Sequence, residues 1–219
     1  MTIMKKYSLM IIAAFVAIAT TTTMDFTGYF NFSALILAPL TLIFWMIYQL
    51  SKEELGLSLS SLKNYGIALL YPAVVLGGVA LIGFAFQKVS IQEQEWTKAW
   101  TNIAITSTLG IIIVIVTEEG FFRGWLWGAL RKKGLNADHT LLVTSLCFTL
   151  WHISPILSPT DYNLPWQQVP IYLSNAMLLG LIWGLLRQIS GSVIVSSVSH
   201  AVWNAIAYNF FGYGEKSGL

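Results

Sequence analysis

Charged residues are scarce in this chain. Only 12 Lys and Arg and 10 Asp and Glu occur among 219 residues, whereas hydrophobic residues make up 56%. Soluble globular domains carry about 25% charged residues, against 10% here, and the mean hydropathy is +0.68. A surface of this composition suits lipid better than water. The net charge of +2 is small and scattered, so we expect no nucleic-acid partner.

Cysteine is nearly absent as well, because Cys147 is the only one in the chain. An internal disulfide is therefore impossible, and the sequence does not indicate a redox compartment. Internal repeats and low-complexity linkers are also missing. We therefore expect residues 1–219 to form a single integral membrane domain.

Long apolar runs are what the chain has in abundance. A membrane-crossing helix needs roughly 20 apolar residues. An eighth helix would arise if the fourth run breaks near Gly120 or Gly124. It would also arise if the Pro-rich segment after the fifth run holds a short helix. We predict an all-α, polytopic transmembrane bundle of seven or eight helices. The seven runs lie at about residues 7–24, 30–50, 64–86, 100–130, 139–154, 171–188 and 192–211.

The first run resembles a signal peptide, because Lys5 and Lys6 precede the apolar stretch 9–19. It lacks a small-x-small cleavage site, and further runs follow, so we expect it to be retained as a helix. Basic residues are enriched on the cytoplasmic side of a membrane, which predicts a cytoplasmic N-terminus here. With that orientation, eight basic residues lie inside and three outside: Lys5, Lys6, Lys52, Lys63, Arg131, Lys132, Lys133 and Arg187, against Lys88, Lys98 and Lys216.

Four of the six prolines lie between the fifth and sixth runs, in the sequence ISPILSPTDYNLPWQQVP. Proline removes a backbone donor and clashes with the preceding helical turn. We therefore expect Pro155 to end the fifth helix just after His152. The rest of this segment is interpreted either as an ordinary exposed loop or as a cap over an intramembrane cavity.

Two glycine pairs have the spacing that lets membrane helices approach closely. They are Gly124 with Gly128, and Gly180 with Gly184. We expect both pairs to mark helix–helix contacts.

Few ionisable side chains lie inside the apolar runs and away from their ends; they include Glu118, Glu119, Arg123, His152 and His200. A carboxylate at the bilayer centre costs about 2.5–3.5 kcal/mol on the insertion scale, so such residues are usually functional. Glu119 and Arg123 are four residues apart and share a helical face, which predicts an ion pair. Glu118 is rotated by about 100° from Glu119 and stays available for chemistry. A purely structural ion pair is the alternative interpretation.

Two further i, i+4 pairs place polar side chains on one helical face, Phe148 with His152 and His200 with Asn204. Counted from the predicted inner ends of their helices, Glu118, His152, His200 and Asn204 lie roughly 16–22 Å from the same membrane face. Three distant segments thus share one polar layer. A single intramembrane histidine is often only an interhelical hydrogen-bonding group, but four such residues at one depth favour a functional site.

At these residues the sequence resembles the CPBP intramembrane peptidases, which include the CAAX prenyl endopeptidases and bacterial relatives. The family motifs Glu-Glu-x-x-x-Arg, Phe-x-x-x-His and His-x-x-x-Asn occur in order, as EEGFFR (118–123), FTLWH (148–152) and HAVWN (200–204). The resemblance covers about residues 100–210. It implies an all-helical membrane fold that hydrolyses a peptide bond.

The resemblance also implies roles for single residues. Glu118 and His152 match the positions that activate water, while His200 and Asn204 match the donors that stabilise the oxyanion. Glu119, Arg123 and Phe148 then support the site. The substrate would be a peptide or protein, and the eukaryotic relatives suggest one that carries a prenyl group at its C-terminus.

Two mechanisms use the same residues. Glu118, His152 and His200 are three donors of the kind that hold a catalytic zinc ion. The HExxH zinc motif and the ExxH spacing of di-iron bundles are both absent. We therefore favour a metal-free glutamate mechanism without a cofactor and keep zinc as the alternative.

Other classes have less support in the sequence. A serine hydrolase would need Gly-x-Ser-x-Gly, which is missing, and all three aspartates lie in predicted loops or helix ends. A proton-coupled transporter would use buried Glu and His residues, but the chain shows no inverted repeat. A non-catalytic membrane scaffold or immunity protein is the remaining alternative.

Overall fold

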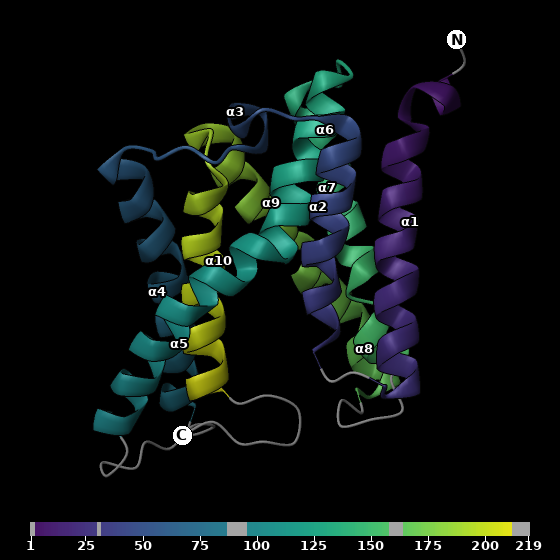
Figure 1. The fold of residues 1–219 in the computed structure, drawn as a ribbon. Coiled ribbons are helices and arrows are strands. Elements are labelled where there is room, and N and C mark those ends of the chain that lie inside the picture. Colours follow the sequence, from purple (N-terminus) through teal and green to yellow (C-terminus); the bar gives the residue numbers. More distant parts are fainter. Residues whose placement is uncertain (1–2, 30–31, 87–95, 158–163, 212–219) are drawn as a thin grey trace.

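The chain is all-helical in the computed structural model, which describes residues 3–29, 32–86, 96–157 and 164–211 (Figure 1). No strand occurs in these ranges, so the predicted all-α class is confirmed. The elements are α1 (Ile3–Thr27), η1 (Ser33–Ile36), α2 (Leu37–Tyr48), α3 (Lys52–Leu55), α4 (Leu62–Ala85), α5 (Trp96–Val116), the π-helix η3 (Gly120–Leu126), α6 (Trp127–Lys132), α7 (Ala137–Trp151), α8 (Ser154–Leu157), η4 (Trp166–Gln168), α9 (Val169–Ser190) and α10 (Val193–Phe210).

Five helical segments of the described chain are long and apolar enough to cross a membrane, which makes the protein multi-pass. These segments match five of the seven predicted spans. The second predicted span forms a shorter apolar helix, Ser33–Tyr48. The seventh forms α10, whose 18 residues include the polar side chains of the third motif. The five are Lys6–Thr27, Leu62–Ala85, Thr97–Val116, Ala137–Leu157 and Trp166–Ser190.

The fourth predicted span is broken, as the glycine-rich sequence near Gly120 indicates. Helix α5 ends at Val116, a turn follows at Thr117, and the π-helix η3 begins at Gly120. In Figure 1, α5 slants across the molecule and α6 then rises more steeply. Gly120 permits this change, because a Cβ atom there would collide with the carbonyl oxygen of Ile115. π-Bulges of this kind are frequent at functional sites.

The fifth predicted helix ends where Pro155 requires it to. Helix α7 stops at Trp151, and His152 is its C-terminal cap. A short helix, α8, follows within the Pro-rich segment, as the eight-helix alternative anticipated. Residues 158–163 lie outside the described residues. The two interpretations of this segment, an exposed loop or a cap, concern these residues and stay predictions.

Both glycine pairs lie at helix contacts. A Cβ atom on Gly180 would approach Ser145 of α7 to 3.2 Å, and one on Gly184 would collide with the side chain of Leu141. Gly128 of α6 lies against the backbone carbonyl of Glu54. The predicted close packing is confirmed for α9 on α7 and for α6 on α3.

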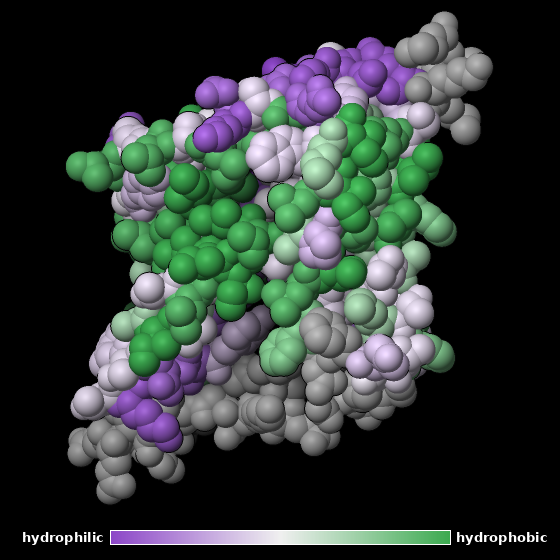
Figure 2. All heavy atoms as spheres, in the orientation of Figure 1, coloured by the Kyte–Doolittle hydropathy of each residue, from purple (hydrophilic) through white to green (hydrophobic). Residues whose placement is uncertain are grey.

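Most basic residues gather at one end of the bundle. In Figure 1 the start of α1, the end of α2, α3, the start of α4 and the end of α6 lie together at the upper end, and Figure 2 shows hydrophilic residues there above a broad apolar band. Lys98 starts α5 at the opposite end. This distribution agrees with the predicted inner face, and which side is cytoplasmic stays a prediction. The basic residues at the upper end include Lys6, Lys52, Lys63, Arg131, Lys132 and Lys133.

Candidate active site

The first motif lies at the junction of α5 and η3, in the interior of the bundle. Arg123 Nη1 lies 3.0 Å from Glu119 Oε1, and both side chains have no exposed surface. Arg123 also donates to the carbonyl of Gly180 at 3.1 Å, and its Cζ lies 4.2 Å from the centre of the Phe148 ring. The ion pair that the i, i+4 spacing predicts is therefore present and fully enclosed.

Glu118 has a different environment, although it is the next residue in the chain. Its side chain is 15% exposed, and Oε2 lies 3.9 Å from His200 Nε2. No hydrogen bond from the described residues reaches this carboxylate. Glu118 is thus the carboxylate of the motif that stays accessible and uncommitted, as the 100° rotation between neighbours predicts.

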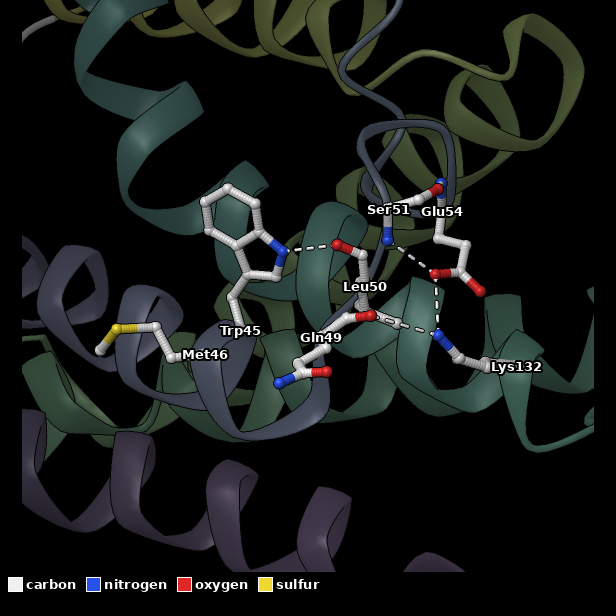
Figure 3. Close-up of a pocket in the computed structure, with 7 residues that line it drawn as sticks. All are labelled: Trp45, Met46, Gln49, Leu50, Ser51, Glu54 and Lys132. Atoms are coloured by element: carbon white, nitrogen blue, oxygen red, sulfur yellow. Dashed lines mark hydrogen bonds and ion pairs between the residues drawn. The ribbon is translucent and has the colours of Figure 1, made fainter.

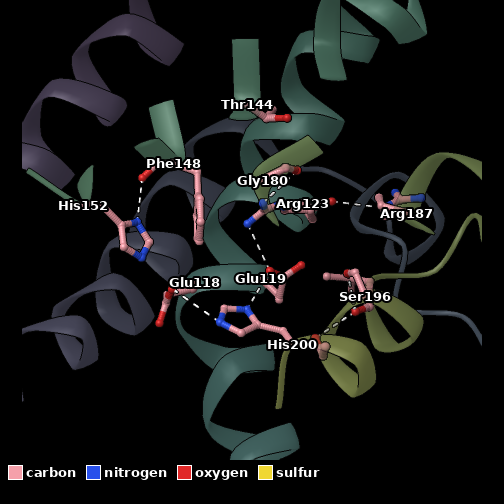
Figure 4. A network of polar contacts seen from close by, with 12 residues as sticks. Glu118, Glu119, Arg123, Thr144, Phe148, His152, Gly180, Arg187, Ser196 and His200 are labelled. Atoms are coloured by element: carbon pink, nitrogen blue, oxygen red, sulfur yellow. Dashed lines mark hydrogen bonds and ion pairs between the residues drawn. The ribbon is translucent and has the colours of Figure 1, made fainter. Parts of the chain in front are cut away.

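His200 of α10 lies between the two glutamates (Figure 4). Its Nδ1 lies 3.0 Å from Glu119 Oε1, and its Nε2 faces Glu118. Because Glu119 is an ionised acceptor paired with Arg123, the proton of this hydrogen bond belongs on His200 Nδ1. The imidazole stacks on the Trp183 ring at 3.7 Å with an interplanar angle of 12°. Glu119 and Trp183 together fix the orientation of His200.

His152 lies at the C-terminal end of α7, where the helix stops. Its Nδ1 lies 2.9 Å from the carbonyl oxygen of Phe148. A carbonyl can only accept, so Nδ1 carries the proton, and the lone pair of Nε2 in a neutral imidazole stays available. The Phe148 ring contacts His152 at 4.3 Å and His200 at 6.2 Å between centroids. In Figure 4 the His152 ring points away from α7, toward the side on which Glu118 lies.

Asn204 is the predicted site residue with the weakest connection to the other site residues. It is half-buried, one helical turn after His200 on α10. Its side chain makes no hydrogen bond with any described residue. The structure thus brings Glu118, Glu119, Arg123, Phe148 and His200 into one connected cluster with His152 beside it, while Asn204 is linked to them by the helix alone.

Two contacts of this site were missed by sequence reasoning. Glu119 and His200 are 81 residues apart, and no local spacing rule relates them. Trp183 is 1% exposed and contacts Phe148, Arg123 and His200. Its position between Gly180 and Gly184 was the available signal, because the face on which α9 packs closely also carries Trp183 three residues after Gly180.

A zinc site would require the side chains of Glu118, His152 and His200 to converge on one point. Within the part of the chain that the structure describes, no group of three or more His, Cys, Asp or Glu side chains could hold a metal ion. Zinc binding by Glu118, His152 and His200 stays the alternative prediction to the metal-free mechanism. Each histidine uses its Nδ1 in a hydrogen bond, which leaves Nε2 as the nitrogen that could bind a metal ion.

Comparison with known proteins gives one match. Residues 98–206, about half of the chain, match the family model described as type II CAAX prenyl endopeptidase Rce1-like. The matched region begins near the start of α5 and ends within α10, so it contains all three motifs. Searches of curated proteins and of solved structures each found no match.

Proposed function

Because the chain belongs to the Rce1-like family of type II CAAX prenyl endopeptidases, we propose that it is an intramembrane endopeptidase in which Glu118 and His152 activate a water molecule. The observation that carries this proposal is the contrast between the two glutamates. Glu119 is enclosed and bound to Arg123 and His200. Glu118 is partly exposed and free of hydrogen bonds from the described residues, as a general base must be before water binds.

The chemical steps follow from this assignment. Glu118 accepts a proton from water, with His152 Nε2 orienting the same molecule. The hydroxide oxygen attacks the peptide carbonyl carbon, and the carbonyl oxygen becomes an anion. Glu118 then returns the proton to the amide nitrogen, the C–N bond breaks, and an acid and an amine leave.

We assign the stabilisation of the oxyanion to His200 and Asn204. With Nδ1 bound to Glu119, His200 can donate from Nε2 only as an imidazolium. Glu119 holds the His200 ring in place through Nδ1, and Arg123 in turn holds Glu119. The Asn204 amide, which has no competing partner among the described residues, can supply a second donor. Donors fixed in a dry site stabilise developing charge strongly.

The substrate we propose is a peptide with a lipid-modified C-terminus, as the family name indicates. Glu118 and the histidines lie inside the bundle, while large apolar side chains cover the outer faces of α4 and α5. A substrate anchored in the bilayer would reach such a site laterally. Peptides with and without a farnesyl group separate this substrate class from general peptidase activity.

The test compares wild type with Glu118→Gln on matched farnesylated and unmodified peptides in lipid vesicles. We expect the wild type to cleave the farnesylated peptide. Glu118→Gln should lose activity by about 10²–10⁴-fold, because it removes a general base but little volume. Glu53→Gln, an exposed carboxylate outside the predicted site, is the control and should keep activity.

Equal cleavage by Glu118→Gln and wild type would show that another group is the base. Absence of cleavage of every peptide by folded wild type would contradict the endopeptidase assignment itself.

A further inference from the structure

Arg187 is a buried guanidinium whose partners are unusual. It lies on α9, one turn before the helix ends at Ser190, and it is 6% exposed. It forms no ion pair with any described residue. A buried charge is normally paired with an opposite charge. Here both hydrogen bonds go to backbone carbonyl oxygens.

These two carbonyls belong to different elements. Arg187 Nε donates to the carbonyl of Arg123 at 3.0 Å, and Nη2 donates to the carbonyl of Glu54 at 3.2 Å. Arg123 lies within the π-helix η3, and its own side chain holds Glu119. Arg187 therefore links the backbone of η3, the element that directly follows the two glutamates, to the segment that contains α3.

The α3 segment is shaped to receive this guanidinium. Gly56 caps α3 with φ +76°, and a Cβ atom at Gly56 would lie 2.5–2.6 Å from three atoms of the Arg187 guanidinium. The Gly56 carbonyl accepts from the backbone N–H of Val193 at 2.9 Å. Ser192 donates to the carbonyl of Ser58 at 2.5 Å. The segment is thus bound to the turn between α9 and α10 as well.

Further contacts, shown in Figure 3, hold helix α3 in place on the side of the pocket. Ser51 and Glu54 form a reciprocal capping box, and Glu54 pairs with Lys132 of α6 at 3.0 Å. The backbone N–H of Ser51 and the Lys132 ammonium hold the pKa of the Glu54 carboxyl below its ordinary value. This capping box lines an open pocket of about 570 Å³, whose lining includes no residue of the three motifs. These contacts fix the position of α3, against which Arg187 packs.

We propose that Arg187 is a positioning residue, which holds η3 against α3 and so keeps Glu118 and Glu119 in their catalytic arrangement. This inference rests on the proposed function for its kinetic consequence. The guanidinium has the planar, multi-donor geometry needed to reach two carbonyls at once, and a lysine ammonium does not. Displacement of a catalytic group by about 1 Å can cost roughly 10²-fold in rate.

Two glycines provide a matched pair for the test. Gly56→Ala introduces a Cβ atom into the Arg187 guanidinium without changing Arg187. Gly191→Ala carries the same left-handed backbone strain, with φ +70° against +76°, but its Cβ atom would meet nothing within 4 Å. Any difference between the two variants therefore reports the contact with Arg187 rather than the strain.

The measurements are kcat and KM on the peptide that wild type cleaves, and amide hydrogen exchange over residues 118–126. Gly56→Ala and Arg187→Lys should lower kcat by roughly 10²-fold with KM changed less than about twofold, and should speed exchange in this segment. Gly191→Ala should do neither. Equal effects of Gly56→Ala and Gly191→Ala, or wild-type kcat and exchange in Arg187→Lys, would overturn the proposal.

Hydrogen exchange needs no substrate, so it tests the role of Arg187 even if the peptidase assignment fails. If Arg187→Lys does not fold, the glycine pair still decides the outcome.

Discussion

Two neighbouring glutamates have opposite environments, and this contrast organises the site at the scale of single residues. Glu119 lies beside Arg123 and His200 with no exposed surface, whereas Glu118 keeps 15% of its side chain exposed. Helical rotation of about 100° per residue makes this separation possible within one dipeptide. The Glu119 carboxylate can then stabilise the fold, while the Glu118 carboxylate stays available for catalysis.

The enclosed ion pair should be needed for folding. Arg123→Gln leaves Glu119 buried without its cation, and Glu119→Gln leaves Arg123 without its anion. We expect each single variant to lose about 3–5 kcal/mol of stability, measured by thermal unfolding in detergent. The double neutral variant should recover part of that loss but no activity, because His200 also loses its partner. Wild-type stability in Arg123→Gln would disprove the pairing.

The oxyanion assignment predicts a particular kinetic pattern for Asn204→Ala. A donor that acts mainly in the transition state lowers kcat more than it affects substrate binding, and loss of one such donor costs roughly 10²–10³ in rate. His200→Ala should behave similarly. Asn209→Ala is the matched control, because Asn209 lies on the same helix and bonds only the carbonyl of Ala205. An unchanged kcat in Asn204→Ala would remove it from the oxyanion site.

At the scale of elements, the break between α5 and η3 is the feature on which the site depends. A continuous α-helix would keep the residues after Glu119 on the 3.6-residue period. The π-helix changes that register between Gly120 and Leu126. Phe121, Phe122 and Trp125 of this π-helix are completely buried.

Gly120→Ala tests this break directly. The new Cβ atom would collide with the Ile115 carbonyl, so we expect a loss of about 1–3 kcal/mol, as for other overpacked sites. Activity should fall with it, because Glu118 and Glu119 directly precede the break. Gly77→Ala in α4 is the control, since its Cβ atom would meet nothing within 4 Å. Unfolding temperatures and cleavage rates should fall for Gly120→Ala alone, and equal behaviour of both variants would contradict the role of the break.

At the scale of the whole molecule, the sequence predicted elements better than the contacts between them. Local rules predicted the all-α class, the helix end before Pro155 and the Glu119–Arg123 pair, and they offered the break near Gly120 as an alternative. Each of these depends on residues only a few positions apart. The contact of Glu119 with His200 and the stack of Trp183 on His200 depend on how α9 and α10 pack on η3. The spacing of residues within one helix does not predict these contacts between helices. The seventh predicted span corresponds to α10, which carries polar site residues within a helix of 18 residues.

The metal question also belongs to the whole molecule, because its possible ligands come from three helices. A zinc ion held by Glu118, His152 and His200 would require these three side chains to converge on it. In the glutamate mechanism Glu118 alone deprotonates the water. We therefore expect purified, active enzyme to contain far less than one zinc per chain by elemental analysis, and we expect activity to survive chelation.

Chelation by itself is ambiguous, since a deeply buried ion can resist removal, so the elemental analysis decides. Metal binding needs neutral imidazoles, and any bound zinc should be lost as the pH falls through the histidine range. Stoichiometric zinc in the wild type that disappears in His152→Ala would overturn the metal-free mechanism. The matched control is His139→Ala, because His139 is exposed at the start of α7 and bonds Asn136. Zinc lost equally from both variants would show adventitious binding rather than a catalytic site.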